Sequence, residues 1–257
     1  MDLFISTFIK IFFIMTPFFV LTVFLTITND ATLIEKRKLA IKVTLSVVVI
    51  SLVLLFFGEH IFPHSAALLS GIDALTHAIE SAVCTKANPL SRIYAEGAFR
   101  HLATAIDRVV DGRPTDDDRA HMLLGAALAG TAIENSMLGG AHASANPLTA
   151  RLGVVHGRAV GMMLPHVMRF NAVVPAAAQT YAHFGTLLRL LKVSDLSLLE
   201  WAEALVRRCR FPALDPAADF ALLADDATRQ WTGKFNPRPL QREDFISLYR
   251  RASGIET

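Results

Sequence analysis

Gly71-Ile-Asp-Ala-Leu-Thr-His-Ala-Ile-Glu80 has the composition of a helix, because apolar helix formers surround its polar side chains. Asp73 and His77 are four residues apart, so a helix places both on one face, one turn from each other. That geometry suits two ligands of one metal ion. We therefore predict a helix over residues 71–84 that presents a ligand pair.

Two histidines downstream, His142 and His156, are candidates for two more ligands. With Asp73 and His77 they form a set of three imidazoles and one carboxylate, which suits a divalent first-row metal such as iron or zinc. Each feature alone has a more common explanation. An Asp–His pair at this spacing is more often a surface or capped core pair, and a histidine in an Ala-rich run is usually a core residue. The combination is what indicates a metal site.

Several motifs occur in a fixed order around these residues and resemble the metal-binding, C-terminal half of the iron-containing alcohol dehydrogenases. They are Gly71–Glu80, Gly139-Gly-Ala-His142, Val155-His156-Gly157, Leu164-Pro165-His166 and Phe170-Asn171. The resemblance extends from about residue 66 to the C-terminus. It implies that Asp73, His77, His142 and His156 bind Fe²⁺ or Zn²⁺. It also implies NAD(P) as the cofactor and a small alcohol or aldehyde as the substrate.

The chain departs from this family at one position. Most members carry a second histidine four residues after the ligand at His142, and there it is thought to help proton transfer. Here the position is Asn146. An amide can orient a water or a hydroxyl group, but it cannot act as a general base near neutral pH. Asn146 is therefore a catalytic candidate whose role is in doubt.

The first 62 residues contain two long apolar runs. Residues 3–28 are apolar except for Lys10 and a few hydroxyl residues, and residues 11–28 carry no charge over 18 positions, which is long enough to span a bilayer. A cleaved signal peptide is the rival interpretation, although no small-residue cleavage site follows. The second run, residues 43–58, has 16 uncharged positions. A buried core helix is the alternative there, but the run is apolar on every face.

The loop between the two runs carries Lys36, Arg37, Lys38 and Lys42, and no further Lys or Arg follows until Lys86. The positive-inside rule places such a loop in the cytoplasm. The stretch 1–58 also resembles the first two helices of MarC-type multi-pass membrane proteins. We therefore predict a two-helix transmembrane hairpin over residues 1–62 in the cell membrane, in contact with membrane lipid. The C-terminal domain then lies outside the cytoplasm.

The rest of the chain, residues 63–257, is predicted to be one metal-binding helical domain, so the fold class is all-α. Thr115 and Asp118 form a capping-box pattern that opens a long helix through Leu138. Small residues along this helix, including Gly125 and Gly130, predict close packing at the centre of the bundle. Pro165 is expected to interrupt the helix after His156. Cys84 and Cys209 are far apart in helical patterns, which indicates two free thiols.

The sequence supports two classes of function. The first is an oxidoreductase domain of the alcohol dehydrogenase type. The second is a catalytically inactive, membrane-tethered metal-binding domain or a fusion of gene fragments. Residues 1–62 contain a single glycine, Gly58, so no Gly-rich phosphate loop precedes the metal-binding half. We therefore expect the chain alone to be inactive, with a separate nucleotide-binding chain as a candidate partner. Its 25 basic and 23 acidic residues form no basic stripe, which disfavours nucleic acid.

Overall fold

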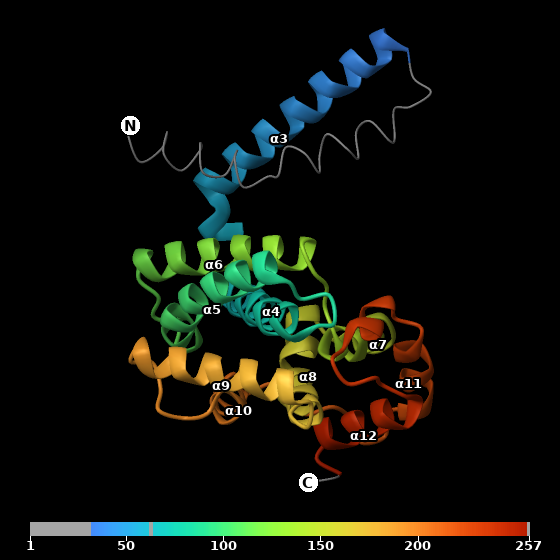
Figure 1. Ribbon diagram of the computed structural model, residues 1–257. Coiled ribbons are helices and arrows are strands. Elements are labelled where there is room, and N and C mark those ends of the chain that lie inside the picture. Colours follow the sequence, from blue (N-terminus) through green and yellow to red (C-terminus); the bar gives the residue numbers. More distant parts are fainter. Residues whose placement is uncertain (1–31, 62–63, 256–257) are drawn as a thin grey trace. The chain divides into compact units, whose positions relative to one another are not determined.

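The computed structural model describes residues 32–61 and 64–255, and all regular secondary structure in these ranges is helical (Figure 1). The all-α prediction is confirmed for this part of the chain. The chain divides into two compact units, Met1–Pro63 and His64–Thr257. The elements in order are α3 (Leu33–Ile61), α4 (His64–Val83), α5 (Pro89–Val110), α6 (Asp116–Glu134), α7 (Gly140–Leu152), α8 (His156–Asn171), α9 (Pro175–Leu190), α10 (Leu198–Arg208), α11 (Phe220–Thr228), the 3-10 helix η1 (Trp231–Phe235) and α12 (Arg242–Ala252).

The first unit contains α3, which includes the second predicted apolar run. The first apolar run lies outside the described residues. Within residues 32–61 and 64–255, none of the helices combines the length and the apolar character that a membrane crossing requires. The transmembrane hairpin therefore stays a prediction.

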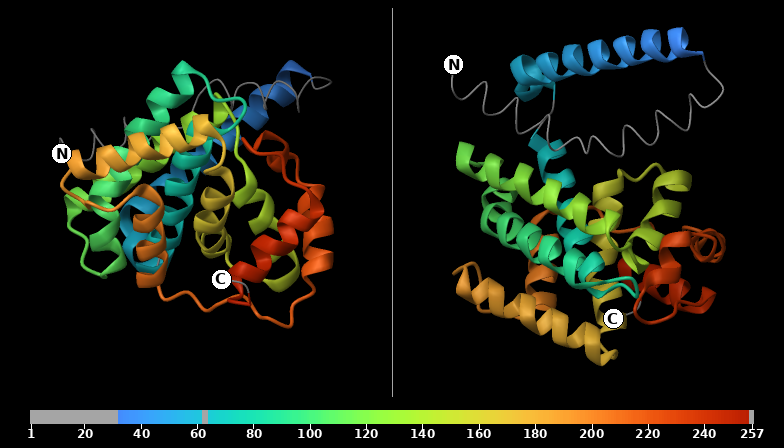
Figure 2. Two further views of the ribbon diagram at one scale, coloured as in Figure 1. Left: turned by 60° about the horizontal axis from the view of Figure 1, so that its bottom comes forward. Right: turned by 45° about the horizontal axis from the view of Figure 1, so that its top comes forward.

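Two helices, α4 and α8, hold the second unit together. α4 packs on α5, α6, α8 and α9, whereas α8 packs on α4, α7, α10 and α12. Figure 2 shows the result from two directions, with α5 and α6 on one side of the α4–α8 pair and α7, α11 and α12 on the other. The core is continuous across both sides and includes Ile72, Phe99, Met163 and Tyr249, each at most 1% exposed. The helices that carry the candidate ligands thus meet in the middle of the unit.

The turn between α5 and α6 is fixed by a buried carboxylate. Asp118 Oδ2 accepts hydrogen bonds from the amide and the hydroxyl of Thr115 at 2.8 and 2.7 Å, which confirms the predicted capping box. Arg108 Nε donates to the same oxygen at 2.7 Å. The Arg108 guanidinium holds the pKa of Asp118 well below its usual range, so this carboxylate stays charged and paired.

The predicted central position of α6 is wrong. Its Gly125 does allow a close approach, because a Cβ there would lie 2.6 Å from Leu102 Cγ on α5. Gly130, however, faces open space, and Leu123 is 73% exposed on the outer face of the helix. The small residues of α6 serve one packed face only, because the helix covers α5 and α4 from outside.

The predicted interruption at Pro165 is also wrong, because α8 runs continuously from His156 to Asn171. A proline inside a helix removes one hydrogen bond and crowds the carbonyl four residues earlier, here that of Gly161. α8 tolerates this cost because it is buried along most of its length. Its neighbours Leu164 and Val167 are 2% and 1% exposed, so tertiary packing outweighs the local penalty.

Candidate metal centre

α4 supplies the first two side chains of the centre. Ile72, Leu75 and Ile79 are each 1% exposed and bury one face of this helix in the core. Asp73 and His77 lie on an adjacent face, and His77 Nε2 is 3.6 Å from Asp73 Oδ1. The i, i+4 pair predicted from the sequence therefore points both groups at the same region.

α7 supplies His142 in its first turn, and its beginning is held by residues that are distant in sequence. Gly139, at the N-cap position, makes no side-chain hydrogen bond. Instead, the amide of Gly140 donates to Asn236 Oδ1 at 3.1 Å, and that of Ala141 donates to Glu80 Oε1 at 2.7 Å. First-turn amides need such acceptors, and a carboxylate is favoured at the positive end of a helix.

The two glycines before His142 make this close approach possible. A Cβ on Gly139 would lie 3.0 Å from both Glu80 Oε1 and Asn236 Oδ1. A Cβ on Gly140 would lie 2.7 Å from Leu240 Cδ1. The Gly-Gly pair therefore leaves room for the two capping side chains that hold the start of α7.

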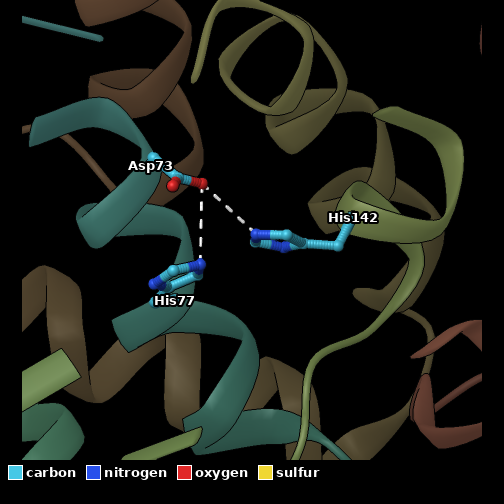
Figure 3. Close-up of side chains that lie close together, drawn as sticks. All are labelled: Asp73, His77 and His142. Atoms are coloured by element: carbon cyan, nitrogen blue, oxygen red, sulfur yellow. Dashed lines mark ion pairs between the residues drawn. The ribbon is translucent and has the colours of Figure 1, made fainter. Parts of the chain in front are cut away.

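Asp73 Oδ1 is the point on which the other three side chains converge. His142 Nε2 lies 3.3 Å from it, and His156 Nε2, at the start of α8, lies 3.7 Å from it. Figure 3 shows Asp73 between His77 and His142, whose ligand atoms all lie within 4.8 Å of one another. The structure thus brings three residues of the predicted set into one cluster and places His156 beside Asp73 but outside that cluster. Their role as metal ligands stays a prediction.

Two atoms at this point are buried without a partner. Among the described residues, neither Asp73 Oδ1 nor His142 Nε2 makes a hydrogen bond, and the two atoms form an ion pair at 3.3 Å when His142 is protonated. Unpaired buried polar atoms are costly and rare. Ligands about 2.0–2.2 Å from a tetrahedral Zn²⁺ stand about 3.3–3.6 Å apart, which is close to the spacing here. The residues present therefore fit a divalent cation.

Glu80 fixes the orientation of the His142 ring. Its Oε2 accepts a hydrogen bond from Nδ1–H of His142 at 2.6 Å, and the Glu80 side chain is 5% exposed. This contact holds the Nδ1–H toward Glu80, so Nε2 faces Asp73 and offers its lone pair there once it has lost its proton. Carboxylates commonly orient metal-binding histidines in this way. Sequence reasoning missed this role. The available signal was that Glu80 follows Asp73 by seven residues and so lies on the same helix face, two turns later.

In the metal-free protein the charges of Asp73 and His142 balance, and His77 is neutral. Burial raises the pKa of Asp73, but the neighbouring His142, His77 and His156 outweigh this and hold it below its usual value. Burial and the charge of His142 lower the pKa of His77 to about 4. Burial would lower that of His142, but Asp73 and Glu80 raise it to about 9. At neutral pH the metal-free His142 ring therefore carries a proton on Nε2 as well as on Nδ1, and a cation must displace the Nε2 proton that faces Asp73.

The centre is most exposed at His156 and least exposed at His142. The side chain of His142 is 4% exposed, those of His77 and Asp73 are 21% and 24% exposed, and that of His156 is 39% exposed. Solvent or a small molecule can therefore reach the group from the His156 side. A metal held by four protein ligands on a half-open face can still accept a further oxygen.

Asn146 lies one turn after His142 on α7. Its Nδ2 donates to Gln230 Oε1 at 2.9 Å, in the segment just before η1. The amide is thus part of a polar pair that joins α7 to the C-terminal segment. This contact does not establish a catalytic role, which stays a prediction.

A second polar connection involves Asn171, at the end of α8. Asn171 and Asn236 exchange side-chain hydrogen bonds of 3.0 and 2.6 Å. Arg238 then donates to the carbonyl of Phe170, and its guanidinium lies 3.8 Å from the centre of that ring. These contacts hold Asn236 in place, and Asn236 in turn caps the α7 helix that carries His142.

Comparison with known proteins covers both parts of the chain. The family model described as Fe-containing alcohol dehydrogenase family, C-terminal, matches residues 67–253, and the model of the MarC family integral membrane protein matches residues 1–71. The second match supports a location at the membrane.

Individual relatives agree with the first match. The chain is 30% identical to 1,3-propanediol dehydrogenase of Klebsiella pneumoniae over 77% of this chain and 53% of that protein. It is 30% identical to the probable alcohol dehydrogenase EutG of Escherichia coli K12 over 74% of this chain and 49% of that protein. The chain thus spans about half the length of the curated relatives it matches.

A solved structure shows the same architecture. The iron-containing alcohol dehydrogenase from Thermococcus thioreducens superimposes with a TM-score of 0.66 at 26% identity, over 76% of this chain and 52% of that one. The helical unit predicted from the sequence is therefore of this type. Through residues 67–253, the chain belongs to the Fe-containing alcohol dehydrogenase family as a carrier of its C-terminal domain.

Proposed function

We propose that the His64–Thr257 unit binds one divalent metal, Fe²⁺ or Zn²⁺, through Asp73, His77, His142 and His156 and serves alcohol–carbonyl oxidoreduction. The observation that carries this proposal is the convergence of three imidazole nitrogens on Asp73 Oδ1 within 3.3–3.7 Å, with two of the atoms buried and unpartnered. When bound, such a metal acts as a Lewis acid that polarises an alcohol or carbonyl oxygen.

The chain's own residues supply positioning. Glu80 keeps the proton of His142 on Nδ1 and caps α7 through the amide of Ala141. The half-exposed His156 leaves one side open for a small substrate. Asn146 and Gln230 offer amide groups that can orient a hydroxyl but cannot remove its proton. The proton of an alcohol must therefore leave to solvent or to another group.

Hydride transfer by this family type needs NAD(P), and we infer that the nucleotide is bound outside these 257 residues, with a separate nucleotide-binding chain as a candidate. This inference is supported by the absence of a Gly-rich phosphate loop from the 257-residue sequence. The alternative is a membrane-tethered metal-binding domain without turnover, or a fusion of gene fragments. The intact convergence of four ligand-type side chains favours the oxidoreductase.

A spectroscopic experiment distinguishes these two functions without the nucleotide. We expect the visible spectrum of the full chain loaded with one equivalent of Co²⁺ to change saturably with a short primary alcohol or aldehyde, because the substrate oxygen enters the open side. The Asp73→Asn variant should lack the starting spectrum, and His183→Ala on α9 should keep it. A Co²⁺ spectrum that no alcohol or aldehyde alters would favour the inert domain.

We further propose that the first unit tethers this domain to the membrane as a two-helix hairpin. The support is the match of residues 1–71 to an integral membrane family and the four basic residues of the predicted loop. The loop is then cytoplasmic, and the metal-binding unit is extracytoplasmic. This orientation separates the unit from the cytoplasmic NAD(P) pool, so it favours the tethered domain without turnover over the oxidoreductase. When fused after Gly71, a reporter that works only outside the cytoplasm should be active, and a reporter that works only inside it should be silent. A cytoplasmic signal from these fusions would rule out the hairpin in this orientation.

A further inference from the structure

A second pair of imidazoles lies between two other helices. His101 on α5 and His121 on α6 bring their Nδ1 atoms to 2.9 Å, with the ring centroids 4.9 Å apart and the ring planes inclined by 47°. α5 and α6 pack along their length. The Arg108–Asp118 contact locks the turn that joins them. The pair is therefore held by a fixed backbone and does not depend on loose surface side chains.

The distance between the two nitrogens suits two ligands of one cation. Metal–nitrogen bonds of about 2.0–2.1 Å, at angles between about 90° and 109°, place the nitrogens about 2.9–3.4 Å apart. In the metal-free protein only one proton fits between two Nδ1 atoms at 2.9 Å, so at least one of them offers a lone pair toward the other. A divalent cation can take the place of that proton with a small ring rotation.

A carboxylate lies on the far side of one ring. Asp117 Oδ2 is 3.7 Å from His121 Nε2, one turn earlier on α6. A carboxylate near the far nitrogen favours the N–H there and leaves the Nδ1 lone pair free for a cation, as in known metal centres. The side chain of His121 is 29% exposed, so water can complete the coordination sphere.

We propose that His101 and His121 form a second, solvent-accessible site for an imidazole-preferring divalent cation, Zn²⁺, Ni²⁺ or Cu²⁺, which bridges α5 and α6. Imidazole ligands select these metals over Mg²⁺ and Ca²⁺. The site uses residues of α5 and α6 only, whereas the proposed catalytic metal is held by α4, α7 and α8. Each site can therefore be tested independently of the other.

Equilibrium dialysis of the full chain against Ni²⁺ tests the proposal. We expect two equivalents in the native protein, one tight and one weaker, because the second site has only two protein ligands. His101→Ala and His121→Ala should each lose the weaker equivalent and keep the tight one. His142→Ala should do the reverse. Asp117→Asn should weaken the second equivalent only a few-fold, about 2–5-fold, because Asp117 is exposed and lies 3.7 Å from His121 Nε2, and His183→Ala should change neither.

A second measurement covers the case in which a substitution disturbs folding. In the His142→Ala background, the electron paramagnetic resonance spectrum of one equivalent of Cu²⁺ should report two ring nitrogens, and His101→Asn should reduce this to one. Cu²⁺ should also raise the midpoint of thermal unfolding of the protein that keeps both His101 and His121, since it binds the folded state. Unchanged Ni²⁺ stoichiometry in both histidine variants, or a Cu²⁺ spectrum indifferent to His101, would show that the pair only shares a proton.

Discussion

The full chain with His142→Ala is expected to lose the tightly held metal completely. His142 is the least exposed of the four candidate ligands, and its Nε2 lies closest to Asp73 Oδ1, at 3.3 Å. Its removal leaves three of the four ligands and a cavity in place of the ring, so the ion should be held too weakly to survive a chelator. Elemental analysis after gel filtration through a chelator should find about one metal ion per native chain and none in the variant.

The matched control is His183→Ala, which removes another histidine paired with a glutamate but outside the centre. His183 Nε2 lies 2.8 Å from Glu96 Oε2 on the surface. This variant should retain the metal. Glu80→Gln should give an intermediate result, about a 10–100-fold loss of metal affinity, because an amide cannot accept from both Ala141 and His142. Native metal content in His142→Ala would refute the assigned ligand set.

The metal-loaded chain by itself is not expected to form NADH from short alcohols. Hydride transfer needs the nicotinamide held about 3–3.5 Å from the reacting carbon. That position requires anchorage of the pyrophosphate, for which the sequence offers no Gly-rich loop. Asn146 also cannot act as the general base, which typically contributes about 10² to 10⁴ in rate. NADH absorbance with a panel of alcohols measures turnover, and an NADH fluorescence titration measures nucleotide binding.

The two causes of inactivity can be separated by two additions. Asn146→His restores a titratable group one turn after His142 but supplies no nucleotide site, so it should not create activity alone. A nucleotide-binding domain of the family, added in trans, should allow slow turnover, and more of it in the Asn146→His chain. Saturable NADH binding with metal-dependent turnover by the unaided native chain would overturn this prediction.

Local sequence patterns were sufficient to predict the helices α4 and α6 and part of the site. Helical spacing alone placed Asp73 and His77 on one face, and the Thr115–Asp118 pattern identified the start of α6. These features depend on residues within one or two turns. Pro165 misled for the same reason, because its local penalty is outweighed by the packing of α8 against helices distant in sequence.

The part of the site that local sequence patterns do not reveal depends on contacts between residues far apart in the sequence. No local pattern links Glu80 to the amide of Ala141, 61 residues later, or Asn236 to that of Gly140, 96 residues earlier. The prolines at 237 and 239 indicate only a turn after Asn236, whereas the role of the Asn236 side chain depends on the tertiary fold. The resemblance to a known family identified His142 and His156 as ligands, but the residues that hold the His142 helix became visible only in three dimensions.

The distant capping of α7 also bears on how the protein is made. Synthesis proceeds from the N-terminus, so all four candidate ligands are present once His156 has been added, long before Asn236. Until that residue arrives and the long loop closes, Gly140 lacks its acceptor and the first turn of α7 lacks one of its two supports. In small zinc domains the ion itself drives folding. In the proposed site the Asn236 cap forms only after all four ligands have been synthesised, so we expect ion uptake to follow completion of the C-terminal segment.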